Sequence, residues 1–151
     1  MSAAPTAEMA PILVAEDDAQ HRLLICAAFA AARLANPIHL VEDGEEAVAY
    51  LAGRGRYADR RRYPLPALVL LDLHMPRRSG LEVLGWLRSN DVLDRVPVLL
   101  LTASEEEADI NEAFAAGASS YLVKPVGFDA LLDVVKTLDL RWQILPAAAG
   151  D

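Results

Sequence analysis

The chain has 151 residues, of which 54% are hydrophobic and 24% charged, and its formal net charge is -8. These values describe one globular domain with a sizeable core and exclude an intrinsically disordered chain. The excess of acid argues against general nucleic-acid binding, because phosphate backbones repel an acidic surface.

Cys26 is the single cysteine, which excludes an internal disulfide and indicates a reducing compartment. No apolar run reaches the roughly 20 residues that a membrane span needs. Residues 1–10 lack the basic start and the apolar centre of a secretion signal. We therefore expect a cytoplasmic protein that does not enter a membrane.

Five short apolar runs alternate with helical patterns along the chain. They span Ile12–Ala15, Ile38–Val41, Ala67–Leu71, Pro97–Leu101 and Ser120–Val123. Four runs are almost continuously apolar, as expected of strands covered on both faces, whereas Ile38–Val41 alternates and predicts an edge strand. Strands that alternate with helices through short connections predict an α/β fold with a parallel sheet wrapped by helices.

Capping residues mark the starts of the predicted helices. Three of them precede an acid by three positions, which is the capping-box spacing. These pairs are Asp43 with Glu46, Ser79 with Glu82 and Ser104 with Glu107. Asp18 is expected to cap a helix that begins near Ala19. Gly117 is placed to end the fourth helix, and an apolar stripe over 128–138 predicts a fifth.

The connection over 53–66 is long and basic, and we predict an extended loop there. It carries Arg54, Arg56, Arg60, Arg61 and Arg62, interleaved with Tyr57 and Tyr63. Contact with RNA or DNA is the less favoured interpretation, because the stretch is short and the protein is acidic. A solvated loop or a contact for an acidic partner surface is favoured.

Polar side chains follow four of the apolar runs. Glu16 and Asp17 come after the first run, Asp72 after the third, Thr102 after the fourth and Lys124 after the fifth. Parallel strands present their carboxyl ends at one edge of a sheet, where open α/β sheets place their sites. Crowded carboxylates repel one another, and Mg²⁺, which prefers oxygen ligands, would relieve that repulsion. The set is therefore suited to hold a divalent cation and a phosphoryl group.

Asp72 is the candidate nucleophile, because a carboxylate can accept a phosphoryl group as an acyl phosphate. Taken alone, each residue of the set also has a plainer explanation. Asp17 could cap a helix, and Asp72 could be a polar strand end. Thr102 could reflect β-propensity, and Lys124 could extend its ammonium into water. Only the joint placement of these residues favours a site.

The ordered motifs are similar to those of one known family. The matching segments are Ile12-Leu13-Val14-Ala15-Glu16-Asp17-Asp18, Leu70-Leu71-Asp72-Leu73-His74-Met75-Pro76 with Gly80, Leu101-Thr102-Ala103, and Tyr121-Leu122-Val123-Lys124-Pro125. Over residues 10–140 the chain resembles the receiver domain of two-component response regulators. The resemblance implies a (βα)5 fold, a doubly wound, flavodoxin-like sheet of order 2-1-3-4-5. We expect a receiver domain over 11–140, an N-terminal extension over 1–10 and a C-terminal tail over 141–151.

The resemblance also implies a role for each site residue. Asp72 would accept phosphate from a histidine kinase, and Asp17 and Asp72 would bind Mg²⁺ directly. The backbone carbonyl of His74 would be a further ligand, and Glu16 would act through water. Lys124 would bridge to the phosphoryl group.

Two further pairs of residues have implied roles in this family. Thr102 and Tyr121 match its switch pair, although Tyr121 could instead be an edge aromatic with its hydroxyl in water. His74 and Ser104 would set the lifetime of the phosphate.

We expect a stand-alone signalling module that is not an enzyme beyond its own phosphorylation and dephosphorylation. It would pass phosphate along a relay or bind a target, with a sensor histidine kinase or a histidine phosphotransfer protein as partner. With its basic loop and Trp142, the chain resembles the stand-alone regulators that serve bacterial phytochromes. In those regulators the fourth helix, fifth strand and fifth helix form a dimer surface.

Two alternatives remain open. An aspartate-nucleophile phosphohydrolase typically carries a second acid where this chain has His74. A degenerate receiver that only binds is disfavoured by the complete set Glu16, Asp17, Asp72, Thr102 and Lys124.

Overall fold

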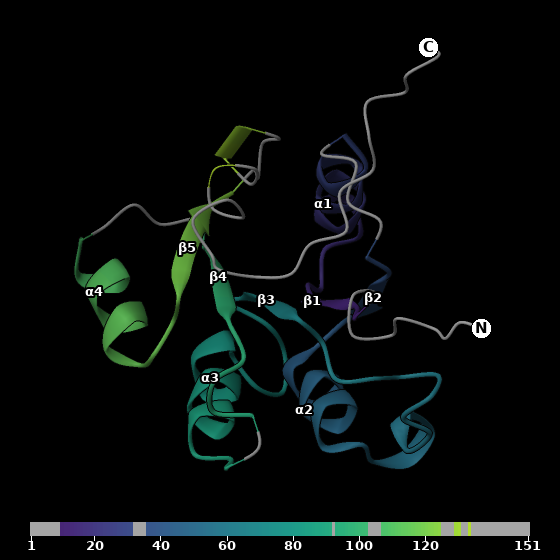
Figure 1. The fold of residues 1–151 in the computed structure, drawn as a ribbon. Helices are drawn as coiled ribbons and strands as arrows, with labels where there is room; N and C mark the ends of the chain where they lie inside the picture. The colour runs from purple at the N-terminus through teal and green to yellow at the C-terminus, as the bar shows by residue number, and fades with distance from the viewer. Residues whose placement is uncertain are drawn as a thin grey trace.

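The computed structural model describes residues 10–31, 36–91, 93–102, 107–124, 129–130 and 133. In chain order its elements are β1 (Ile12–Ala15), α1 (Ala19–Ala31), β2 (Ile38–Val41), α2 (Gly44–Ala52), the short 3-10 helix η1 (Gly55–Tyr57), β3 (Leu68–Asp72), α3 (Gly80–Arg88), β4 (Val98–Thr102), α4 (Glu107–Ala115) and β5 (Ser120–Val123) (Figure 1).

The five strands form one parallel sheet of order β2-β1-β3-β4-β5. This order confirms the predicted doubly wound α/β fold and places β2 at an edge, as its alternating pattern indicated. β3 and β4 begin and end one residue later than predicted. The ladder continues past the apolar runs, because Leu73 N donates to Leu101 O at 2.7 Å and Lys124 N donates to Thr102 O at 2.8 Å. Asp72 and Thr102 are therefore the last residues of their strands.

Apolar side chains cover both faces of the sheet, since successive residues of a strand point to opposite sides. On one face, Ile12 and Val14 of β1 pack with Ile25 and Phe29 of α1. On the other face, β1, β3 and β4 pack against α2 and α3, and this cluster also includes Ala113 of α4. Figure 1 shows α1 separated from α2 and α3 by the sheet. None of the helices in the described ranges combines the length and hydropathy that a membrane span requires.

The helix starts confirm two of the predicted caps in full. Asp18 Oδ1 accepts from the backbone N–H of Gln20 at 2.8 Å and of His21 at 3.3 Å. Ser79 and Glu82 form a complete capping box, with bonds of 3.2 and 3.0 Å.

The predicted box at Asp43 is only half formed. Asp43 accepts from Glu46 N at 2.7 Å, but the Glu46 carboxylate accepts from Glu42 N instead of returning to Asp43. The third pair begins at Ser104, which lies outside the described residues.

The segment before β3 is more ordered than the predicted extended loop. Residues Gly55–Tyr57 form η1, and the Tyr57 side chain is buried. Arg60 donates to the backbone carbonyls of Tyr50, Leu51 and Tyr63 at 2.8, 2.6 and 3.1 Å. Two of these carbonyls belong to the last turn of α2, where a cation is favourable. The loop prediction was therefore wrong for η1, because the contacts that order it join distant positions.

Candidate functional site

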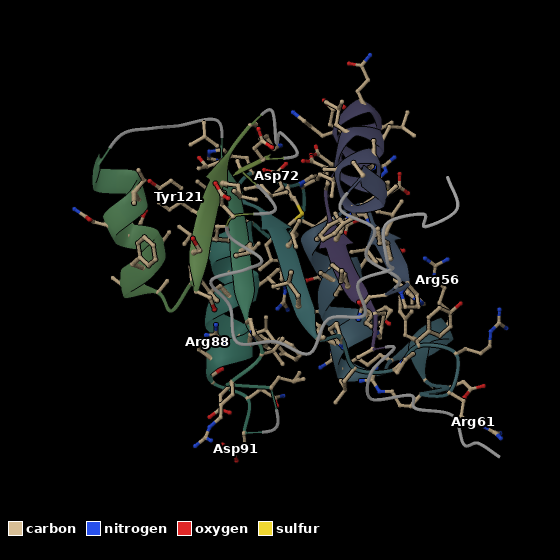
Figure 2. The ribbon with its side chains drawn as sticks, turned by 45° about the horizontal axis from the view of Figure 1, so that its top comes forward. Arg56, Arg61, Asp72, Arg88, Asp91 and Tyr121 are labelled. Carbon is tan, nitrogen blue, oxygen red and sulfur yellow. The ribbon has the colours of Figure 1, made fainter. Side chains whose placement is uncertain are left out.

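Three carboxylates meet where β1 and β3 end. Glu16 and Asp17 directly follow β1, and Asp72 ends the neighbouring strand β3, in a register that pairs Ala15 with Leu71. One carboxylate oxygen from each of the three lies within 4.8 Å of the other two. Glu16 and Asp72 are buried, whereas Asp17 is exposed at the mouth of the cluster. Figure 2 marks Asp72 at this edge of the sheet.

Lys124, which directly follows β5, reaches into this cluster. Its Nζ lies 2.7 Å from Asp72 Oδ2 and 2.8 Å from Glu16 Oε1. Burial opposes the charge on this ammonium, yet its bonds to Asp72 and Glu16 raise the pKa of Lys124 above its usual value. Lys124 therefore carries a positive charge that both buried carboxylates share.

The surroundings of Glu16 disfavour the ionised form of its carboxyl group. Burial, followed by the nearby Asp72 carboxyl group, raises the pKa of Glu16 to about 7, against an ordinary 4.5. Three carboxylates face one ammonium, so the pocket has an excess of negative charge when all four groups are ionised. A divalent cation with a preference for oxygen ligands would balance that charge, and the donor set fits one.

The loop after β3 is held closely against Asp72. His74 N donates to Asp72 Oδ1 at 3.1 Å, and Gly80 N donates to Leu73 O at 3.0 Å. A Cβ atom on Gly80 would lie 2.4 Å from the carbonyl oxygen of Asp72. Only glycine therefore allows α3 to start this close to the strand end, which keeps the His74 backbone beside the carboxylates.

Two arginines of the same loop join it to the start of α2. Arg77 has a φ of 70° and donates to Asp43 Oδ2 at 3.1 Å. Arg78 forms an ion pair with Glu45 of α2. These two contacts attach the loop after β3 to the amino end of α2.

The remaining predicted site residues have different surroundings in the structure. Thr102 ends β4 between β3 and β5, is buried, and accepts a backbone bond from Lys124. Tyr121 is in β5, where its half-buried ring packs edge-on against Phe114 of α4 with centroids 5.8 Å apart. His74 has an exposed side chain, and Ser104 lies outside the described residues. The structure thus brings Glu16, Asp17, Asp72 and Lys124 together, with Thr102 adjacent.

Two basic residues of α1 that were not predicted also adjoin the cluster. His21 Nδ1 lies 3.9 Å from Glu16 Oε1 and 3.8 Å from Asp18 Oδ2. Arg22 donates to the backbone carbonyl of Glu16 at 2.7 Å. Their place in the first turn of α1, directly after the acids, is a local signal that could have indicated them.

The fold and this pocket define a class of protein. The family model of the response regulator receiver domain matches residues 12–136, and the chain belongs to this family. Receiver domains bind a divalent metal at an acidic pocket, and the carboxylates of Glu16, Asp17 and Asp72 form such a pocket here.

Several known receivers are similar over nearly the whole chain. The response regulator Rcp1 of Synechocystis is 31% identical over 140 residues, which cover 91% of this chain and 93% of Rcp1. The bacteriophytochrome response regulator RtBRR has a TM-score of 0.83 at 37% identity, covering 92% of this chain and 83% of RtBRR. AtBRR, also a bacteriophytochrome response regulator, has a TM-score of 0.81 at 37% identity, covering 92% and 99%. The predicted resemblance to receivers and to phytochrome-associated regulators is confirmed.

Proposed function

We propose that Asp72 accepts a phosphoryl group from a histidine kinase or a histidine phosphotransfer protein. A carboxylate oxygen of Asp72 forms the new bond to phosphorus while the bond from phosphorus to the donor imidazole breaks. The donor imidazole leaves with the electron pair and regains a proton. The observation that carries this proposal is the contact of Lys124 Nζ with Asp72 at 2.7 Å, inside a cluster with two further acids.

The residues around Asp72 would then have separate tasks. Lys124 neutralises charge on the phosphoryl oxygens, and Asp17, Asp72 and the backbone carbonyl of His74 hold Mg²⁺, with Glu16 acting through water. The bound Mg²⁺ supplies charge neutralisation and alignment for the transfer. A form of Rcp1 that holds Mn²⁺ has been solved, with a TM-score of 0.73 at 30% identity, covering 91% of this chain and 99% of that one. This likeness supports a divalent cation in the same pocket.

Thr102 and Tyr121 would convert phosphorylation of Asp72 into a change of conformation. The Thr102 hydroxyl moves toward the phosphoryl group, and the Tyr121 ring rotates inward from its contact with Phe114. His74 and Ser104 set how long the phosphate persists. The switched surface of α4, β5 and the predicted fifth helix would form a homodimer or bind a target.

The likeness to RtBRR and AtBRR supports a phytochrome-type sensor kinase as the partner. We further propose that residues 11–140 are the unit that folds, with 1–10 and 141–151 outside it, and that it works in the cytoplasm.

The proposal is tested by incubation with acetyl phosphate and Mg²⁺, followed by intact mass spectrometry. We expect one added phosphoryl group on the wild-type chain and none on Asp72→Asn. An adduct that persists in Asp72→Asn would contradict the assignment. Many turnovers of small phosphate esters would instead indicate the phosphohydrolase alternative. Size measurement with and without beryllofluoride tests the dimer.

A further inference from the structure

A cleft of about 500 Å³ lies at the opposite end of the sheet from Asp72. Its lining includes the apolar side chains of Leu51, Leu65, Trp86 and Leu93 and the guanidinium-bearing Arg54 and Arg60. These residues come from the ends of α2 and α3 and from the segments that lead into β3 and β4. They therefore surround the amino ends of the strands, whereas the phosphorylation site proposed above lies at the carboxyl ends. In Figure 2, Asp72 and Arg61 accordingly lie at opposite ends of the molecule.

The basic segment over 53–66 lies beside this cleft and is held in place by side-chain contacts. Besides the three bonds of Arg60, the Tyr50 hydroxyl donates to Pro64 O at 2.9 Å. The rings of Tyr50, Tyr57 and Tyr63 pack with centroids 5.0 to 5.9 Å apart. A partner that binds here meets backbone that is already ordered, so little conformational entropy would be lost on binding.

The arginines of the basic segment differ in how they are held. Arg60 is bonded to backbone carbonyls, and Arg56, although exposed, is paired with Glu46. Arg54 and Arg62 are exposed, and the Arg61 side chain is 98% exposed with its contact to Asp59 at 4.0 Å. None of the described residues that line the cleft is acidic. Arg54, Arg61 and Arg62 thus form a local positive surface on a chain whose net charge is -8.

We propose that this cleft and Arg54, Arg61 and Arg62 form a docking site for an acidic segment of a partner protein. A large apolar residue of that segment contacts Leu65 and Trp86, and flanking carboxylates pair with the arginines. Leu65 is 39% exposed, so an apolar contact there removes surface from water. Arginine is suited to this task, because its planar guanidinium pairs with carboxylates through two hydrogen bonds.

An acidic protein segment fits these observations better than a nucleic acid does. Tyr57 is buried, and Tyr63 packs edge-to-face against Tyr50 and Tyr57 inside the cluster, so these rings offer no platform for stacked bases. Binding of a nucleic acid through charge alone would make no use of the apolar cleft beside these arginines.

The test uses the full chain and a fluorescein-labelled peptide of glutamates around a central Phe, measured by fluorescence anisotropy and by amide NMR shifts. We expect shifts around Arg54, Leu65 and Trp86 and an affinity that falls with added salt. Arg54→Glu combined with Arg61→Glu should weaken binding about tenfold or more. Leu65→Asp, an exposed change that leaves the core intact, should weaken it as well. Arg95→Glu is the matched control, because Arg95 is exposed and belongs neither to the cleft lining nor to the basic segment over 53–66.

Several outcomes would overturn the docking site. Equal binding of a peptide with Gln in place of Glu, an equal effect of Arg95→Glu, or shifts confined to α4 and β5 would each do so. Tighter binding of a thymidine oligonucleotide would assign the surface to nucleic acid. Self-association that the double Glu variant abolishes would assign it to a second copy. Asp72→Asn should bind the peptide as the wild type does, which separates this proposal from that of phosphorylation.

Discussion

Lys124 Nζ lies 2.7 Å from Asp72 Oδ2, although 52 positions separate the two residues in the chain. The contact crosses the end of β4, because β4 lies between β3 and β5 in the sheet. Lys124 N is also bonded to Thr102 O at this crossing, which fixes the backbone from which the side chain extends. The side chain is only 12% exposed, so little water screens its attraction for Asp72 and Glu16. This one ammonium therefore stabilises the Asp72 carboxylate and, above about pH 7, that of Glu16 as well.

We expect Lys124→Gln to lower the free energy of unfolding in the absence of Mg²⁺ at pH 8 by about 2–4 kcal/mol, since it leaves buried carboxylates without their cation. Added Mg²⁺ should recover part of the loss, because it binds the folded state and balances the same charges. Urea denaturation with and without Mg²⁺ measures both effects. A variant as stable as the wild type without Mg²⁺ would mean that the observed ion pairs contribute little.

The raised pKa of Glu16 predicts a dependence of stability on pH. The folded protein holds a proton on Glu16 up to about pH 7, whereas the unfolded chain releases it near the ordinary value of 4.5. Between these two values the folded state binds more protons, so without Mg²⁺ the free energy of unfolding should fall as pH rises. The full effect is on the order of 3 kcal/mol. Denaturation at a series of pH values measures it.

Glu16→Gln is the control for this dependence. Gln carries no charge, so the variant should be more stable than the wild type above pH 7 and should lose this part of the slope. Mg²⁺ should bind the wild type more tightly as pH rises, roughly twentyfold between pH 5.5 and 7.5, because the proton and the cation compete. Isothermal titration measures that affinity. A slope that survives in Glu16→Gln would assign the proton to another group.

The sheet and most of the site were predictable because their signals are local. Four apolar runs are followed directly by Glu, Asp, Thr or Lys, and parallel strands bring their carboxyl ends to one edge whatever the connections between them. The sequence pattern missed that the ladder includes Asp72 and Thr102, since polar side chains do not show whether their backbone is still paired. The contact of Lys124 with Asp72 could be expected only in outline, because its geometry depends on the neighbouring strands.

The order of the basic segment could not be predicted from the sequence, for a different reason. Its order comes from Arg60 binding carbonyls of α2 and from three tyrosines that pack together, and these contacts join positions up to 14 residues apart. Glu46 illustrates the same limit, because its carboxylate accepts from the Tyr57 hydroxyl at 2.7 Å besides Glu42 N. Spacing alone could not show that a side chain suited to a capping box was used elsewhere.

The close approach of Gly80 to Asp72 predicts a large effect of a small substitution. Gly80→Ala would place its Cβ 2.4 Å from the carbonyl oxygen of Asp72, so α3 or the strand end must move. We expect a loss of about 2 kcal/mol or more in the free energy of unfolding. Gly85→Ala is the matched control in the same helix, because nothing lies within 4 Å of its Cβ position. It should be neutral or stabilising by up to about 1 kcal/mol. Equal effects of the two in urea denaturation would contradict the steric account.

Arg60 and Arg61 are adjacent arginines that should differ sharply when truncated. Arg60→Ala removes a guanidinium that holds three backbone carbonyls, including two at the end of α2, and should lower the free energy of unfolding by roughly 2–3 kcal/mol. Arg61→Ala removes a side chain that is 98% exposed and should change it by less than about 0.5 kcal/mol. Arg60→Lys should recover only part of the loss, because an ammonium cannot match the planar fork of the guanidinium. Thermal unfolding with near-ultraviolet circular dichroism of the tyrosine cluster measures all three. If Arg60→Ala were as stable as Arg61→Ala, the order of η1 would have to come from the tyrosines alone.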